Sequence, residues 1–125
     1  MKIEINSKKA PGAIGPYSQA VKAGNFIYVS GQLPINAETG EMPTEIKEQT
    51  KQSLENVKAI LKEAGADLEN VVKTTVYLAD MSLFGEMNEV YGKYFSGIYP
   101  ARAAFAVKEL PKKALVEIEV VAYQD

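Results

Sequence analysis

The chain has 125 residues, of which 46% are hydrophobic and 24% charged, and this composition is typical of a single globular domain spanning residues 1–125. It contains no cysteine and no histidine, which excludes disulfides, thiolate metal sites, a cysteine nucleophile and the most common acid or base at neutral pH. The net charge of −2, with acids and bases interspersed, argues against an extended phosphate-binding surface, so we expect no nucleic-acid partner.

Membrane and export signals are also missing from the sequence pattern. Residues 1–9 alternate apolar and charged side chains and do not resemble the apolar core of a signal peptide. No run of about eighteen apolar residues, the length needed to cross a membrane, occurs anywhere. We therefore expect a cytoplasmic protein without a membrane partner.

The first elements in chain order are strands. Residues 2–6 predict a short edge strand, and the prolines and glycines of 10–16 predict a loop. Segments 17–22 and 26–30 flank Ala23-Gly24-Asn25, where glycine and asparagine supply the positive φ angles of a tight turn. This arrangement predicts a β-hairpin.

Helical spacing of apolar residues from Ile46 to Ala64 predicts a long helix, with Gly65 as a candidate C-cap. The β-branched segment 71–79 predicts a strand. A second helix follows, with Asp80 or Ser82 as its N-cap. Its apolar face consists of Phe84, Met87, Tyr91 and Tyr94 or Phe95.

Segments 99–107 and 115–123 predict the last two strands, joined by a connection long enough for an antiparallel return. The order β, ββ, α, β, α, β, β indicates an α+β domain with two helices on one face of a mixed sheet. The strands carry apolar side chains at both parities, as in 71–79, so the second face also needs a cover. Because no element remains to supply it, we expect other subunits to do so.

One guanidinium interrupts the small, apolar strand 99–107. By the period of two, Arg102 shares a strand face with Ala104 and Ala106, whose small side chains leave a hollow beside it. Arg102 is then either an anion-binding group or a residue whose stem lies on the sheet while its head reaches solvent or a structural carboxylate. The spacing by itself favours the second interpretation.

Two acids share one face of the last strand, Glu117 and Glu119, while apolar residues occupy the other face. One of them is a candidate to meet Arg102 across strands. The alternative is a solvated polar face or a cross-strand ion pair that contributes roughly 0.2–1 kcal/mol.

The predicted hairpin offers further candidates. Tyr17 follows Gly15-Pro16, and Ser30 precedes Gly31, where a missing side chain allows close approach of a ligand. Without other evidence, Tyr17 is best interpreted as an aromatic residue of the core or of an interface. Ser30 has no histidine to activate it, which excludes a serine hydrolase of the usual kind.

Short motifs spread over the chain resemble those of one known family. They are Ile-Gly-Pro-Tyr-Ser-Gln-Ala at 14–20, Ser-Gly-Gln-Leu-Pro at 30–34, Gln-Ser-Leu-Glu-Asn-Val-Lys-Ala-Ile-Leu at 52–61, Val-Lys-Thr-Thr-Val-Tyr-Leu at 72–78, Met87-Asn88, Pro-Ala-Arg at 100–102, Leu110-Pro111 and Val-Glu-Ile at 116–118. On these motifs the sequence resembles the reactive-intermediate deaminases, the Rid or YjgF-like family, over nearly its whole length.

The resemblance implies a chorismate-mutase-like α+β fold and a barrel-like homotrimer with clefts between neighbouring subunits. It also implies a hydrolase acting on C=N bonds, which converts 2-iminobutanoate, 2-iminopropanoate and enamine tautomers such as 2-aminoacrylate into 2-oxo acids and ammonia. By position, Arg102 binds the substrate carboxylate and Glu117 orients or activates water. The cleft is then lined by Tyr17, Ser30, Gly31 and Asn88.

Ala104 departs from the family pattern, because many relatives have cysteine at this position. The change removes a thiol, while the backbone at Ala104 is still able to bind the substrate nitrogen. A planar arginine fork suits a carboxylate, and a nearby carboxylate suits water, so no metal or other cofactor is required. We also expect Arg102, lying near Glu117, to keep that acid ionised.

Two other functions fit the same residues. A trimer that binds small 2-oxo acids or amino acids without turning them over uses Arg102 in the same way. A ribonuclease or translation inhibitor, as reported for some relatives, is disfavoured by the absence of histidine and by a pI near 5.3.

Overall fold

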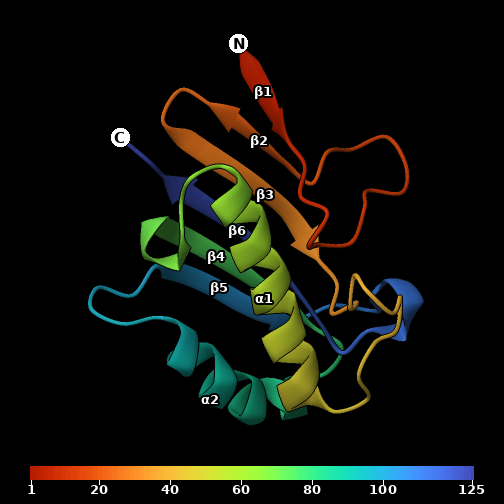
Figure 1. Ribbon diagram of the computed structural model, residues 1–125. Helices are drawn as coiled ribbons and strands as arrows, with labels where there is room; N and C mark the ends of the chain where they lie inside the picture. The colour runs from red at the N-terminus through yellow and green to blue at the C-terminus, as the bar shows by residue number, and fades with distance from the viewer.

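A six-stranded mixed sheet with two helices packed on one of its faces makes up the computed structural model, which describes residues 1–125 (Figure 1). The strand order across the sheet is β1-β2-β3-β6-β4-β5. The elements are β1 Lys2–Ile5, β2 Ala20–Ala23, β3 Phe26–Gln32, α1 Ile46–Glu63, β4 Val71–Leu78, α2 Phe84–Tyr94, β5 Ala101–Ala106 and β6 Val116–Tyr123. The predicted α+β class and the placement of both helices on one face are confirmed.

The predicted hairpin is present, but its first strand is shorter than predicted. β2 and β3 pair antiparallel across a turn in which Gly24 has a φ of 60°. Residues 17–19 belong to the preceding loop instead, because the buried Gln19 side chain binds that loop. Its amide accepts from Ser7 N at 2.7 Å and donates to the carbonyls of Ser7 and Pro11 at 3.0 and 2.8 Å.

The last two strands are not neighbours. β4 and β5 run parallel, joined by a crossover through α2, and β6 lies between β3 and β4, antiparallel to both. The connection between β5 and β6 therefore passes β4 instead of forming a hairpin. As a result, β5 is an edge strand, with one side of its backbone unpaired.

Helix α1 ends as the sequence predicts. Gly65 has a φ of 81°, its N–H donates to Lys62 O at 3.0 Å, and Ala66 N donates to Leu61 O at 2.9 Å. These two bonds form a Schellman motif, in which glycine adopts the left-handed conformation at low cost. Neither helix has the length and apolar character needed to cross a membrane.

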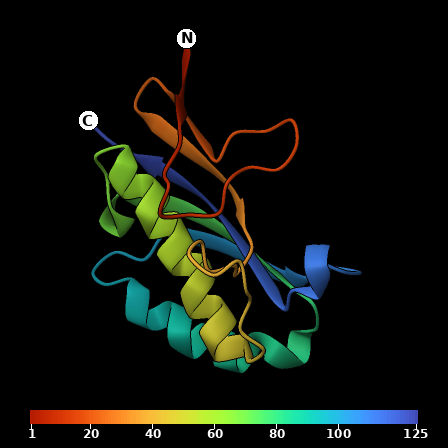
Figure 2. The same cartoon turned by 45° about the vertical axis from the view of Figure 1, so that its right-hand side comes forward.

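The start of α2 differs from the prediction in detail. Asp80 caps a short 3-10 turn, Met81–Leu83, by accepting from Ser82 N at 2.8 Å, and α2 follows directly from this turn. The face that α2 turns toward the sheet buries Met87 and Tyr91. In Figure 2, which is turned by 45° from Figure 1, α1 and α2 lie on the same face of the sheet.

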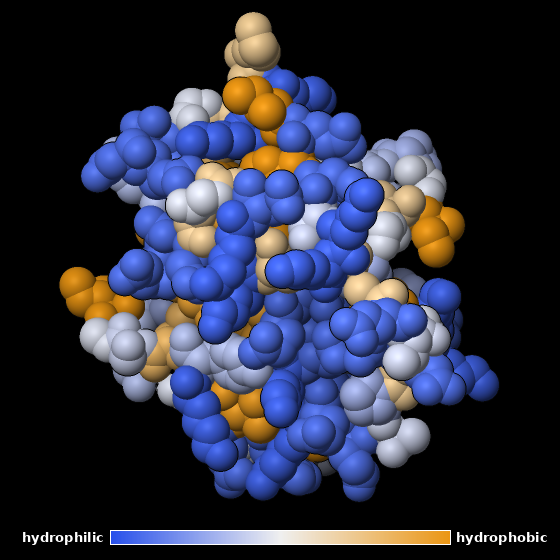
Figure 3. Space-filling model, in the orientation of Figure 1, coloured by the Kyte–Doolittle hydropathy of each residue, from blue (hydrophilic) through white to orange (hydrophobic).

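The two faces of the sheet differ sharply in exposure. Under the helices, alternate residues of the central strands, such as Val76 and Ile118, are fully buried. The outer surface over these helices is largely hydrophilic (Figure 3). The open face instead carries aromatic rings with exposed fractions between 38% and 47%, namely Phe26, Tyr28, Phe105 and Tyr123. Apolar residues thus lie on both faces, as predicted.

Candidate functional site

The register of the strands places Arg102 and Glu117 on opposite faces of the sheet. Arg102 pairs with Thr74, a residue buried beneath the helices, whereas Glu117 pairs with Tyr77. Because successive side chains of β4 alternate between faces, Thr74 and Tyr77 point to opposite sides. The expectation that an acid of the last strand meets Arg102 across strands is therefore wrong within one chain.

Arg102 is held against α2. Its Nη1 donates to Asn88 Oδ1 at 2.7 Å, and its Cζ lies 4.7 Å from the ring centroid of Tyr91 and 5.4 Å from that of Phe84. The Tyr91 ring is itself fixed, because its hydroxyl shares a 2.8 Å hydrogen bond with the buried Thr74 Oγ1. The aromatic rings orient the guanidinium by cation–π contact.

The arginine fork remains available to an anion. A guanidinium has five N–H donors, and only one of those of Arg102 has a partner in the chain. Arg102 is also exposed and is the only arginine in the sequence. A shallow hollow in front of it is lined by Asn88, Tyr91, Gly92, Tyr99, Pro100 and Arg102.

The hollow differs from the one expected beside the small residues of β5. Ala104 does lie on the same face as Arg102, where it is partly buried against the core, but it does not line the hollow. Helix α2 and the residues before β5 supply the walls instead. Of the predicted site residues, Asn88 is thus the one in contact with Arg102.

The other predicted residues meet at a second place. Tyr17, Ser30, Gly31 and Glu117 line one cavity of about 820 Å³, together with loop residues that include Ile35. Tyr17 is 52% exposed, so it forms a wall of this cavity and is not a core aromatic. Ser30 is fixed by donating its hydroxyl to Ser18 O at 2.6 Å.

Gly31 lies directly against the Glu117 carboxylate. A Cβ atom on Gly31 would overlap Glu117 Oε2 and lie 2.9 Å from its Cδ. Gly31 is also inside the irregular stretch of β3, where the register with β6 shifts between Val29 and Gln32. Glycine at this position allows the strand backbone to approach the carboxylate closely.

The environment of Glu117 keeps it protonated more readily than an ordinary glutamate. Burial raises its pKa, and the neighbouring Glu119 raises it further. The salt bridges of the chain join Lys47 to Glu89 and Lys62 to Asp67, so they provide no cation for Glu117. The expectation that Arg102 keeps Glu117 ionised is therefore wrong in the single chain, because the guanidinium is on the other face.

Three buried polar residues of α1 were not singled out as site residues from the sequence, and two of them bond backbone that lines the Glu117 cavity. Ser53 Oγ donates to Gln32 O at 2.9 Å, and Asn56 Nδ2 donates to Leu33 O and Ile35 O, both at 3.0 Å. Gln49 accepts from the backbone N–H just before β6 at 2.8 Å. The signal was present, because Gln49, Ser53 and Asn56 recur at helical spacing on the buried stripe of α1.

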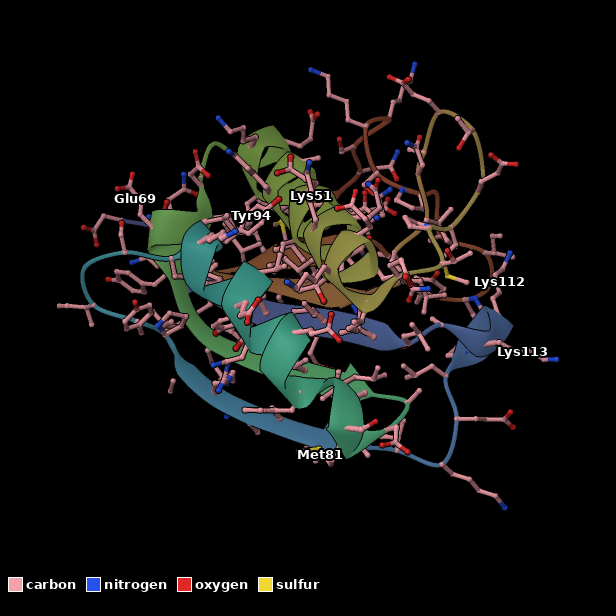
Figure 4. The ribbon with its side chains drawn as sticks, turned by 90° about the horizontal axis from the view of Figure 1, so that it is seen from below. Lys51, Glu69, Met81, Tyr94, Lys112 and Lys113 are labelled. Atoms are coloured by element: carbon pink, nitrogen blue, oxygen red, sulfur yellow. The ribbon has the colours of Figure 1, made fainter.

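A strained turn also borders the cavity. Lys112 and Lys113 both have a φ of 57°, which is uncommon for residues other than glycine, and Lys112 lines the cavity with Glu117. Figure 4 shows both lysines on the turn before β6, at the end of the molecule away from Glu69. Two consecutive lysines do not predict a positive φ from the sequence. No cluster of three or more acidic residues is placed to hold a metal ion.

Comparison with known proteins identifies the family. Residues 7–124 match the model of the family described as endoribonuclease L-PSP. A RutC family protein of Pyrococcus abyssi is 58% identical over 97% of this chain and 96% of its own length, and the 2-iminobutanoate/2-iminopropanoate deaminase of Mus musculus is 53% identical over 96% and 90%. A crystal structure of E. coli TdcF with bound serine superposes with a TM-score of 0.95 at 41% identity, covering 98% of this chain and 99% of that one. The chain therefore belongs to the endoribonuclease L-PSP family, whose members include RidA and YjgF, as its motifs predicted.

Proposed function

We propose that this protein hydrolyses reactive 2-imino acids and their enamine tautomers, such as 2-aminoacrylate, to 2-oxo acids and ammonia. The observation that carries the proposal is the pair of complementary half-sites: an exposed guanidinium held by Asn88, and a carboxylate over Gly31 without a hydrogen-bond donor in the chain. Mammalian relatives that are 51% and 53% identical to this chain are named 2-iminobutanoate/2-iminopropanoate deaminase, which supports the same chemistry.

The two half-sites combine only if they come from different copies of the chain. We infer a homotrimer in which the Arg102 half of one subunit faces the Glu117 half of its neighbour, giving three clefts. The exposed aromatic rings on the open face support such an assembly, because rings of this size are rarely left in water on one side of a sheet. The edge strand β5 offers further unpaired backbone for the contact.

In the proposed reaction Arg102 binds the substrate carboxylate through two parallel N–H donors. This contact fixes the C=N carbon relative to a water molecule held by Glu117. An enamine first takes a proton from solvent on C3 and becomes the iminium ion. Glu117 then takes a proton from the water as its oxygen bonds to the C=N carbon.

Collapse of the tetrahedral adduct completes the turnover. The proton held by Glu117 passes to the nitrogen, the C–N bond breaks with its electron pair leaving on ammonia, and the hydroxyl proton passes to solvent as the 2-oxo group forms. The raised pKa of Glu117 suits both steps, because the group must accept and return a proton near neutral pH. No cofactor enters the balance.

The remaining residues have supporting roles in this proposal. Asn88 orients the guanidinium, while Tyr17 and Ser30 wall the cleft around the substrate. Ala104 lies on the edge strand, where a backbone group is able to bind the substrate nitrogen.

A trapping assay tests the proposal. A PLP-dependent dehydratase generates 2-aminoacrylate, semicarbazide traps the imine, and the protein is expected to lower the amount trapped. Arg102→Ala is expected to abolish this effect, whereas Lys93→Ala, which removes an exposed cation from the neighbouring helix α2, is expected to retain it. If the unaltered protein leaves trapping unchanged, the proposed activity is wrong.

A second function, binding of amino acids or 2-oxo acids without turnover, is favoured by the bound serine in TdcF. Serine has the carboxylate that the free Arg102 fork matches. Calorimetry with serine and with 2-oxobutanoate distinguishes the two functions. Saturable binding that depends on Arg102, in protein that does not reduce imine trapping, identifies the binding function.

A further inference from the structure

The open face of the sheet carries a second carboxylate beside Glu117. Glu119 lies two residues further along β6 on the same face, about 7 Å away by the rise of a strand. Tyr77 pairs directly with Glu117 in the register, yet its hydroxyl donates diagonally to Glu119 Oε1 at 2.6 Å. The nearest donor on β4 thus serves Glu119 and leaves Glu117 free to face the cavity.

The contact between Tyr77 and Glu119 is preformed. The Tyr77 ring packs edge-to-face on Phe105, with centroids 5.5 Å apart and an angle of 86° between the planes. The pKa of Tyr77 is raised to about 12, chiefly by the hydrogen bond to Glu119, so the phenol remains a donor at all ordinary pH values. A hydrogen bond to a carboxylate favours its charged form.

We propose that Glu119, held by Tyr77, is a positioning residue whose fixed negative charge keeps Glu117 basic enough to take a proton from water. The inference rests on the proposed function, in which Glu117 is the base. Two carboxylates on one strand face repel each other, so the one without a donor holds its proton to higher pH. The close backing by Gly31 keeps Glu117 beside this charge.

Other ionisable groups face the pair from every neighbouring element. Lys112 and Tyr17 border the cavity that contains Glu117, and Lys2 and Tyr28 border the adjoining hollow that contains Glu119. Lys73 lies further along the same face of β4, opposite Val121. None of these groups forms a hydrogen bond or salt bridge with either acid, and Glu119 is the charge that most affects the pKa of Glu117.

A titration that needs no catalysis tests the inference. Side-chain carboxyl ¹³C resonances of the assembled protein report the protonation of each glutamate, and the spectrum of Glu117→Gln assigns the resonance of Glu117. In Glu119→Gln, which keeps an oxygen for Tyr77 but removes the charge, Glu117 is expected to titrate at lower pH. Glu69→Gln, at the far end of the molecule in Figure 4, is expected to leave the Glu117 titration unchanged.

The pH profile of imine hydrolysis provides a second readout. The acidic limb of kcat/KM is expected to move to lower pH in Glu119→Gln, so the ratio of variant to unaltered activity rises severalfold as the pH falls. An unchanged Glu117 titration, with activity reduced equally at every pH, would show a merely structural role and overturn the inference. If Glu119→Gln does not fold, Tyr77→Phe replaces it: Glu119 then loses the hydrogen-bond donor that favours its charged form, and Glu117 is expected to titrate at lower pH, as in Glu119→Gln.

The two readouts separate this inference from the proposed function. If the protein does not hydrolyse imines but shows the coupled titration, the link between Glu119 and Glu117 stands and the proposed reaction is wrong. If the protein is active but the coupled titration is absent, the proposed reaction stands and the role of Glu119 is wrong.

Discussion

Arg102 and Glu117 point away from opposite faces of one sheet, although β4 alone separates the strands that carry them. Arg102 packs on the rings of α2, and Glu117 lies over Gly31 at the cavity on the open face. One chain is therefore unable to place both groups on one small substrate. The proposed reaction requires two copies.

Mixed oligomers of Arg102→Ala and Glu117→Gln chains are expected to recover activity that neither variant has by itself. In a ring whose clefts each join two neighbours, random mixing of equal amounts unites both intact halves in about one cleft in four. Unfolding the variants together and refolding them gives such hybrids, and imine trapping measures the recovered activity. The control mixes variants refolded separately. Verified hybrids that are as inactive as their parents would contradict shared clefts.

Gly31→Ala is expected to remove most of the activity while leaving the fold intact. The added methyl group displaces the Glu117 carboxylate, so kcat/KM falls by about 10²-fold or more, as expected when a general base is misplaced. Gly85→Ala is the matched control, because a Cβ there meets no atom within 4 Å and alanine favours a helix. Activity of Gly31→Ala equal to that of the control would show that the position of Glu117 is unimportant.

Asn88→Asp is expected to impair substrate binding more than Asn88→Ala does. An aspartate at 2.7 Å from Nη1 pairs with the guanidinium and competes with the substrate carboxylate, whereas alanine only removes an orienting acceptor. We expect KM to rise by roughly 10-fold or more in Asn88→Asp and by less in Asn88→Ala. Steady-state kinetics over a range of substrate concentrations measures both. A lower KM for aspartate than for alanine contradicts the role assigned to Arg102.

The period of the hydrophobic residues predicted the elements well because the helices and the central strands β3, β4 and β6 each bury one defined stripe. The alternation of Val116, Ile118 and Val120 marks the face of β6 that lies under the helices, and it correctly places Glu117 and Glu119 on the other face. The local sequence pattern could not predict the strand order, because the position of β6 between β3 and β4 depends on pairing between distant segments.

The site was harder to predict for a related reason. β5 has small residues at both odd and even positions, so its sequence does not reveal whether Arg102 points toward the helices or toward the open face of the sheet. The close approach of Gly31 to Glu117 depends on the irregular register of two strands far apart in the chain. The polar residues of α1 could be read from the sequence, since Gln49, Ser53 and Asn56 recur on its buried face, but the partners of Asn56 are loop carbonyls that no side-chain pattern marks.

Glu117→Gln is expected to stabilise the protein at neutral pH and to lose this advantage in acid. Because the folded state raises the pKa of Glu117, the stability that this group provides is complete below the pKa of the unfolded chain and is lost as the pH rises through the folded value. Glutamine does not titrate, so the variant gains relative to glutamate over that window. Urea unfolding at fixed protein concentration, between about pH 4 and pH 7, measures the difference. A difference that does not change with pH contradicts the raised pKa.

Asn56→Ala is expected to destabilise the protein by about 1–3 kcal/mol, because it leaves the carbonyls of Leu33 and Ile35 without their buried donor. These residues line the Glu117 cavity, so loosening them also lowers activity at temperatures well below unfolding. Lys51→Ala, on the exposed side of the same helix, is the matched control and is expected to change stability by less than about 0.5 kcal/mol. Urea unfolding and imine trapping on the same samples compare the two. Equal stability of the two variants would mean that the loop is held without Asn56, and the polar stripe of α1 would then have no part in shaping the cleft.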